Sequence, residues 1–216
     1  MYYLRQDVAR YAIDTYKKFL IKTYSFTPGA EAYHNCSLAY YALGKMDSAL
    51  MQINETRDQK QLPEYYSDSG TYYAENGDLE NALSDFSKAI ELDPTLIGAY
   101  NNRASYIWFQ NGDYQKAVED LTRVINLEPN DAFAYSNRAY AYYKLKDFEN
   151  AFLDAFKSVE LENRNPYVYR VLALLYDAID EKDEAKNAVE GAISWGLPTD
   201  GDEEFEGLMK KLGLTK

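Results

Sequence analysis

Cysteine and histidine, a common nucleophile and base pair, occur once each in this chain, as Cys36 and His34. On the helix that the surrounding pattern predicts, a separation of two residues places them roughly 200° apart around the axis, so they face away from each other. A lone histidine and a lone cysteine also fall short of the clustered ligands that a metal site needs. The sequence has no phosphate-binding loop and no nucleotide-binding fingerprint. We therefore expect no catalytic site, no metal and no cofactor, and we interpret Cys36 as a small buried residue.

The charge of the chain excludes one class of partner. With 23 basic and 35 acidic side chains the net charge is −12, whereas nucleic-acid binding needs clustered Lys and Arg, of which there is no example here. The acidic run 200–206 is typical of a solvated helix start rather than of acid–base machinery. No apolar run reaches the ~18 residues of a membrane span, and no signal peptide follows Met1. We expect a cytoplasmic chain without membrane insertion, in agreement with its single cysteine.

A regular spacing of alanines organises the whole sequence. Successive members stand 33, 35, 34 and 34 residues apart, and a tyrosine series follows the same period. The alanines are Ala49, Ala82, Ala117, Ala151 and Ala185, and the tyrosines are Tyr33, Tyr66, Tyr100, Tyr135 and Tyr169. Two short helices repeated at such a period cannot bury their apolar face alone, so neighbours must stack and leave an extended surface. This period favours a binding scaffold over a catalytic pocket.

The best-formed unit extends from Pro63 to Leu96. Its first half places Tyr66, Gly70 and Tyr73 at i, i+4 and i+7, which is one stripe of a helix. Gly77 and Asp78 then predict a turn and a helix cap, after which Ala82, Phe86 and Ala89 repeat the same spacing, and Asp93-Pro94 closes the unit. This Tyr/Gly/Tyr stripe, followed by Ala/Phe/Ala and a closing proline, resembles the tetratricopeptide repeat family.

The resemblance covers most of the chain and implies an all-α solenoid of about five helix-turn-helix repeats in a single array. The expected repeats are 30–62, 63–96, 97–131, 132–165 and 166–196, with one extra residue near Gln110–Gly112. Turns are expected at Gly44, Gly77, Gly112, Lys146 and Asp180–Glu181. An N-terminal helix lies within 1–29, with Leu4, Val8, Tyr11, Thr15 and Phe19 on one face. A capping helix within 197–216 carries Phe205, Leu208, Met209 and Leu212.

Two arginines are interpreted as structural. Arg103 and Arg138 each follow an asparagine early in a first helix, while Asp120 and Asp154 stand at matching places in second helices. Ion pairs between these side chains would join helices or repeats. Most of the 22 tyrosines are likewise interpreted as core residues between helices rather than as ligand contacts.

In tetratricopeptide arrays the first helices line a concave groove, so the resemblance implies that residues beside the packed stripe point into it. The candidate peptide-binding residues are Asn35, Asn102, Trp108, Phe109, Asn137, Tyr140, Tyr143 and Arg170. Asparagine amides both donate to and accept from a peptide backbone. Aromatic rings supply the anchoring area typical of interfaces, and Arg170 would place a single carboxylate. The alternative remains that these asparagines only cap or bridge neighbouring helices.

One branch of the family captures the acidic C-terminal tails of chaperones with a carboxylate clamp of Lys, Asn and Arg residues. Across residues 63–165 only Asn102 matches the clamp, so this partner is rejected. Two hypotheses remain: a non-catalytic scaffold that binds an extended peptide or protein segment in its groove, and a self-association or assembly module, which would form homo-oligomers or belong to a larger multi-repeat protein.

Overall fold

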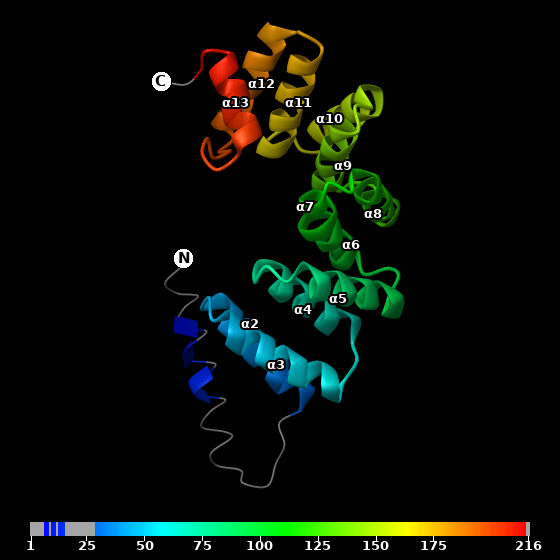
Figure 1. Cartoon of the computed structure of the whole chain (residues 1–216), viewed down its shortest axis with the longest axis vertical. Helices are drawn as coiled ribbons and strands as arrows, with labels where there is room; N and C mark the ends of the chain where they lie inside the picture. The colour runs from blue at the N-terminus through cyan, green and yellow to red at the C-terminus, as the bar shows by residue number, and fades with distance from the viewer. Residues whose placement is uncertain (1–6, 9, 12, 16–28, 215–216) are drawn as a thin grey trace. The chain divides into compact units, whose positions relative to one another are not determined.

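In a computed structural model, the described parts of the chain are residues 7–8, 10–11, 13–15 and 29–214, and their regular structure is helical, without a strand. The helices are α2 (Ala30–Ala42), α3 (Met46–Gln59), α4 (Pro63–Glu75), α5 (Leu79–Leu92), α6 (Ile97–Arg103), η1 (Ala104–Trp108), α7 (Phe109–Asn111), α8 (Tyr114–Leu127), α9 (Ala132–Lys144), α10 (Phe148–Leu161), α11 (Pro166–Ala178), α12 (Lys182–Ser194) and α13 (Glu203–Lys211). The predicted all-α repeat fold is confirmed. In Figure 1 the two helices of a pair, such as α9 and α10, lie side by side.

Each helix pair turns where the sequence predicts it. The five turn residues all have positive φ, whether glycine or not: Gly44 (68°), Gly77 (83°), Gly112 (73°), Lys146 (62°) and Asp180 (64°). A left-handed residue ends the first helix and lets the second fold back against it. Asp78 then caps α5 by accepting the backbone N–H of Asn81 at 3.1 Å.

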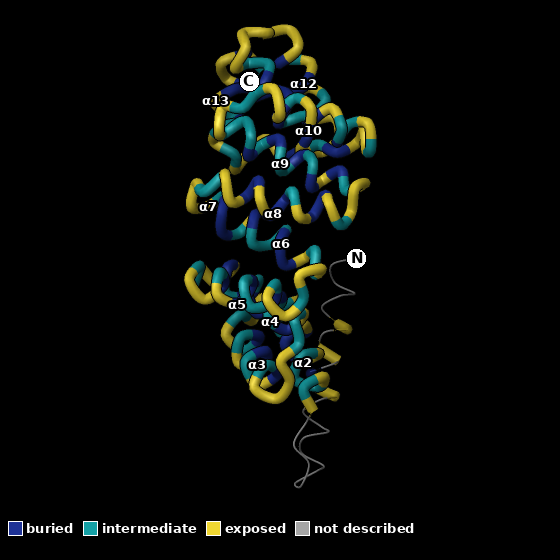
Figure 2. The backbone as a smooth tube through the Cα atoms, turned by 90° about the vertical axis from the view of Figure 1, so that its right-hand side faces the viewer, coloured by how far each residue is buried: buried dark blue, intermediate teal, exposed yellow. Residues whose placement is uncertain are grey.

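The alanine period marks the contact between paired helices. Ala49, Ala82, Ala117, Ala151 and Ala185 are all fully buried. Small side chains there let two helix backbones approach closely. In Figure 2 the buried residues recur along the helices of each compact part, as this packing requires.

The third repeat accommodates its extra residue in a π-helical turn. Residues Ala104–Trp108 form η1 between α6 and α7, upstream of the expected site near Gln110–Gly112. A π-turn adds one residue to a helix without breaking it. The added residue therefore rotates every following side chain, Trp108 included, about the helix axis.

The chain divides into two compact units, residues 1–107 and 108–216. In the first unit Ala49, Ile53, Tyr65 and Tyr72 form a core between α3 and α4. In the second, one larger core extends from Ala139 through α10, α11 and α12 to Leu212, with Phe205, Leu208 and Met209 of α13 included. Helix α13 thus covers the last apolar surface of its unit, as expected of a capping helix.

The N-terminal helix presents a different face from the expected one. Val8 and Tyr11 are 66% and 74% exposed, and Thr15 is also exposed, whereas Ile13 is buried against Ala39 of α2. Leu4 and Phe19 lie outside the described residues. The expectation was wrong for Val8, Tyr11 and Thr15. Ile13 lies two residues from both Tyr11 and Thr15, which is roughly the opposite side of a helix, and its side chain is the one that packs on α2.

The predicted ion pair of Arg138 with Asp154 is present. Nε donates to Oδ2 at 2.7 Å and Nη2 to Oδ1 at 2.9 Å, which is a bidentate arrangement. Burial alone would lower the pKa of Arg138, but the Asp154 carboxylate outweighs it and raises the pKa. In the first unit, Arg57 of α3 forms an ion pair with the buried Asp85 of α5, which joins the second helices of two successive repeats and which the sequence interpretation had missed.

Candidate functional site

Polar side chains in the first unit connect the first helices of successive repeats. His34 Nε2 lies 2.7 Å from Oδ2 of Asp68. The Glu75 carboxylate accepts from Tyr41 at 2.6 Å and from Tyr106 at 2.9 Å. Burial, followed by this carboxylate, raises the pKa of Tyr106 to about 12. These hydrogen bonds therefore connect the first helices of neighbouring repeats. They also occupy the Tyr41 and Tyr106 hydroxyls, which are then not available to donate to a ligand in the groove.

The two candidate asparagines of this unit, Asn35 and Asn102, differ in their hydrogen bonding. The amide of Asn102 donates to Thr71 Oγ1 at 3.1 Å, so it bridges neighbouring helices. Asn35 is exposed, and its side chain makes no hydrogen bond within the described residues.

Trp108 lies in the core, not on an open groove surface. Its side chain is buried, and the indole Nε1–H donates to Oδ2 of Asp120 at 2.7 Å. In the fourth repeat the packed stripe consists of Tyr135, Ala139 and Tyr142, and position 108 lies one period of 34 residues before Tyr142. The extra residue in the π-turn therefore moves Trp108 onto the packed stripe, and its expected role as an exposed anchor is corrected.

In the second unit the structure brings four candidate residues to one cavity of about 360 Å³: Phe109, Asn137, Tyr140 and Arg170. Helices α9 and α11 form two of its walls, and the segment 197–202 ahead of α13 forms another. We call this site the α11 cavity. Its volume lies within the ~300–1,000 Å³ range of ligand sites, and four of the candidate residues line it.

Arg170 already holds carboxylates of its own chain. It pairs with both oxygens of Asp202, one of them at 3.0 Å from Nη2, and Nη2 lies 3.4 Å from Oε2 of Glu204. The guanidinium also lies 4.7 Å from the centre of the Tyr140 ring. The expectation that Arg170 places a ligand carboxylate therefore needs correction, because Asp202 and Glu204 occupy that position.

Tyr140 and Tyr143 belong to the same network. The Tyr140 hydroxyl donates to Oε2 of Glu204 at 2.9 Å, and Lys144 Nζ donates to Oε1 at 3.2 Å. Burial raises the pKa of Tyr140, and the Glu204 carboxylate raises it further. The Tyr143 ring stacks 6.2 Å from that of Tyr140. Phe109 meets Tyr140 edge-on at 5.6 Å. Tyr140 therefore anchors α13 and forms part of the cavity wall.

Three polar groups of the α11 cavity remain unpaired. Neither the Asn137 amide nor the Asp200 carboxylate makes a hydrogen bond or ion pair within the described residues. Ser136 is 1% exposed, and its Oγ has no partner in the same described part of the chain. Sequence interpretation missed Ser136 and Asp200. The acidic run was taken as solvated surface, since only the fold reveals that this segment lies against α11.

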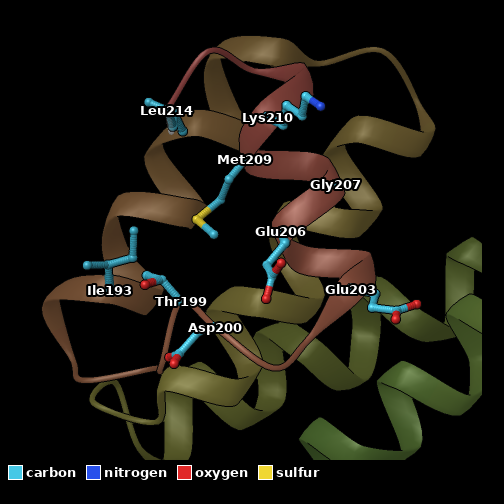
Figure 3. A pocket seen from close by; sticks show the side chains of 9 residues that line it. All are labelled: Ile193, Thr199, Asp200, Glu203, Glu206, Gly207, Met209, Lys210 and Leu214. Carbon is cyan, nitrogen blue, oxygen red and sulfur yellow. The ribbon is translucent and has the colours of Figure 1, made fainter. Parts of the chain in front are cut away.

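A second, larger cavity of about 740 Å³ is lined by Thr199 and Asp200 of the same segment and by residues of α12 and α13. Figure 3 shows Met209 and Glu206 reaching from α13 toward Ile193, Thr199 and Asp200. The Gly201 N–H donates to Oε1 of Glu206 at 2.7 Å, which ties the segment to the helix. Asp200 lines both cavities.

Two other kinds of functional feature are absent from the described residues. These residues bring no three His, Cys, Asp or Glu side chains together as metal ligands. None of the described helices combines the length and apolar character that a membrane crossing requires.

Comparison with known proteins identifies the repeats. The family model described as "Tetratricopeptide repeat" matches residues 63–96, and one described as "TPR repeat" matches residues 106–146. No curated protein matches the chain.

Solved structures share the fold at low identity. MamA (residues 41 to the end) from Desulfovibrio magneticus RS-1 is 23% identical, with a TM-score of 0.66 over 84% of this chain and 96% of that one. The C-terminal part of a TPR repeat-containing protein from Cytophaga hutchinsonii is 20% identical, with a TM-score of 0.71 over 98% and 84%. The protein pilF from Pseudomonas aeruginosa is 17% identical, with a TM-score of 0.72 over 85% and 82%. The family models thus identify tetratricopeptide repeats at residues 63–96 and 106–146, and the solved structures share the helical repeat fold.

Proposed function

We propose that this chain is a non-catalytic scaffold that binds an extended peptide or protein segment, and that the α11 cavity is its main contact site. The tetratricopeptide fold suggests a protein-interaction scaffold, and proteins of this family are generally non-catalytic. A stacked array leaves one continuous face of first helices, which suits a segment without structure of its own.

The observation that carries the proposal is the unpaired amide of Asn137 beside aromatic rings. The amide offers a donor and an acceptor, which are the two groups that a peptide bond needs. Tyr167, which is 52% exposed, lies on the same cavity with Phe109 and supplies apolar contact area. Aromatic side chains of this kind anchor interfaces because they bury a large area at little cost in conformational entropy.

The experiment starts from a library of random dodecapeptides displayed on phage and panned on the full chain. Selected peptides are synthesised, and their Kd is measured for the wild type, for Asn137→Ala and for the control Asn126→Ala. Asn126 is an exposed residue of the second helix α8, so its replacement removes an amide remote from the first-helix face. We expect Asn137→Ala to weaken binding more than about tenfold, a loss of at least ~1.4 kcal/mol.

Tyr140 is unsuitable for this test because it also anchors α13 through Glu204. Tyr167→Ala serves instead as the aromatic variant, with a similar loss expected. Failure to select any peptide, or an affinity that Asn137→Ala and Tyr167→Ala leave unchanged, contradicts the proposal.

A second candidate function is self-association through the end of the array. Ile193, which lines the 740 Å³ cavity of Figure 3, is 42% exposed, and Trp195 two residues later is 44% exposed. The C-terminal end of α12 therefore presents apolar side chains to solvent. Light scattering over a range of concentrations tests it. An oligomer that Ile193→Lys converts to monomer supports this candidate, and a monomer at all concentrations rejects it.

A further inference from the structure

We propose that the α11 cavity selects a segment carrying a lysine or arginine, and that the Asp200 carboxylate receives the cation. This inference rests on the proposed function and adds to it the charge of the ligand. It follows from the charges around the cavity, from groups there that lack partners, and from the aromatic ring beside them.

The local charge is strongly negative. Residues 197–206 carry five carboxylates and no basic side chain. The basic side chains that pair with this segment are Arg170 and Lys144, so five negative charges face two positive ones. Both cations are committed to Asp202 and Glu204. This leaves Asp200, Glu203 and Glu206 without a cation among the described residues, and Glu206 accepts the Gly201 N–H.

Asp200 is the uncompensated carboxylate that lines the α11 cavity. It is exposed and has neither an ion pair nor a hydrogen bond within residues 29–214. In Figure 3 the Lys210 side chain lies at the opposite end of α13 from Asp200. An incoming ammonium or guanidinium group would therefore meet a carboxylate that no cation of the described chain already holds.

The buried hydroxyl of Ser136 points to a ligand independently of charge. It is 1% exposed, lines the cavity and has no partner in the described residues. A buried polar group without a partner costs free energy. Together with the Asn137 amide it gives the cavity two unused polar groups for a peptide backbone, next to the carboxylate that would hold the side chain.

Aromatic surface beside Asp200 suits the long stem of a basic side chain. Tyr167 lies on the same cavity and is half exposed. Lys and Arg bury their aliphatic stems on apolar surface while the charged end stays at a polar group, and their cations are attracted to ring faces.

An acidic segment is disfavoured by the same geometry. It would have to displace Asp202 and Glu204 from Arg170, and Asp202 also caps α13 by accepting the Phe205 N–H at 3.1 Å. Like charges brought together across an interface repel, and the chain as a whole carries −12.

The experiment uses three pools of acetylated, amidated decapeptides with net charges of +2, 0 and −2. The full chain is titrated with each pool, and the side-chain amide signal of Asn137 in ¹H–¹⁵N spectra reports occupancy of the α11 cavity. We expect the affinity to be highest for the basic pool, lower for the neutral pool and lowest for the acidic pool. The affinity of the basic pool should fall as salt rises from about 50 to 300 mM, because salt screens exposed charges.

A matched pair of variants then isolates Asp200. A lysine peptide from the basic pool, and its twin with norleucine in place of lysine, are measured against the wild type, Asp200→Asn and the control Asp183→Asn, an exposed residue of α12. Asp200→Asn should weaken the lysine peptide about two- to fivefold, the range for exposed charge pairs, and leave the norleucine peptide unchanged. Asp183→Asn should change neither.

The outcomes separate the two proposals. If no pool shifts the Asn137 amide, the cavity is not a peptide site and the proposed function fails. If all pools shift it equally, or if Asp200→Asn weakens both peptides alike, the segment binds without charge selection and only this inference is overturned.

Discussion

A Cβ atom built on Gly70 of α4 would lie 2.7 Å from Cδ1 and Cε1 of the Phe86 ring in α5. Real Cβ atoms do not approach carbon so closely, so the two helices meet at a distance that only glycine permits. The corresponding first-helix positions in later repeats are the buried Ala104, Ala139 and Ala173, and the residues at the Phe86 position are the smaller Leu121, Ala155 and Val189. The large Phe86 side chain therefore accounts for the glycine at this contact.

Replacing Gly70 by alanine is predicted to destabilise the fold. Overpacking a core contact costs about 1–3 kcal/mol, which exceeds the ~1 kcal/mol that alanine gains over glycine inside a helix. Urea denaturation should therefore give a lower midpoint for Gly70→Ala. Gly98→Ala in α6 is the control, because no atom lies within 4 Å of its new Cβ and it should be neutral or stabilising.

A second variant tests the cause of that loss. Phe86→Leu on the Gly70→Ala background removes ring atoms that the new methyl group meets, so part of the lost stability should return. If Gly70→Ala stabilises the protein as much as Gly98→Ala does, the close contact of α4 with α5 is not real.

Repeat period and turn positions were readable from the sequence because they depend on local residue types. Even Lys146 and Asp180, which stand where other repeats have glycine, adopt positive φ. Trp108 was misplaced because one added residue rotates a helix by about 100°. The extra residue could be accommodated in the turn or within the helix. Packing between helices decides which of the two occurs, and the sequence alone does not predict that packing.

Trp108→Phe is predicted to destabilise the second unit. The variant keeps an aromatic ring but removes the indole N–H that donates to Asp120 at 2.7 Å, and Asp120 is 6% exposed. Withdrawing a donor from a buried carboxylate costs about 1–3 kcal/mol. Trp195→Phe is the matched control, since Trp195 is 44% exposed and should tolerate the change. Equal denaturation midpoints for both variants would contradict the buried position of Trp108.

The α11 cavity was only partly predictable, for a reason visible at Arg170. Its helix position and its place beside the packed stripe follow from the period. Its partners Asp202 and Glu204 lie 32 and 34 residues later, in a segment whose path depends on how α13 docks. No local pattern predicts that docking. The sequence therefore did not predict that Asp202 and Glu204 pair with Arg170, or that Asp200 does not.

The contact of Arg170 with Asp202 is predicted to make the attachment of α13 depend on pH. Burial alone would raise the pKa of Asp202, but hydrogen bonds from Arg170 and from the Phe205 N–H outweigh it, so the pKa is lowered below its ordinary value of about 3.8. A carboxylate with a lowered pKa contributes stability above its ordinary pKa, and that contribution is lost as pH falls through the lowered value.

The stability of Asp202→Asn should therefore be lower than that of the wild type at pH 7, and the difference should disappear as pH falls from the ordinary value of about 3.8 through the lowered pKa. Asparagine still caps the helix but cannot hold the guanidinium by charge. Hydrogen exchange of the α13 amides measures the difference, with faster exchange expected in the variant at pH 7. A gap that stays constant down to pH 2 would show that another group controls this attachment.

The Cys36 thiol is predicted to react slowly. It is 3% exposed, and burial raises its pKa to about 11. At pH 8 only about one thiol in a thousand is then ionised, and the thiolate is the reactive form. Labelling with a disulfide reagent should be far slower than for a free thiol, should accelerate as pH rises toward 11, and should reach full speed in denaturant. His34→Gln should leave the rate unchanged because the imidazole is bonded to Asp68 and does not activate the thiol. Rapid labelling at neutral pH, slowed by His34→Gln, would instead indicate an activated cysteine and reopen the catalytic interpretation of this pair.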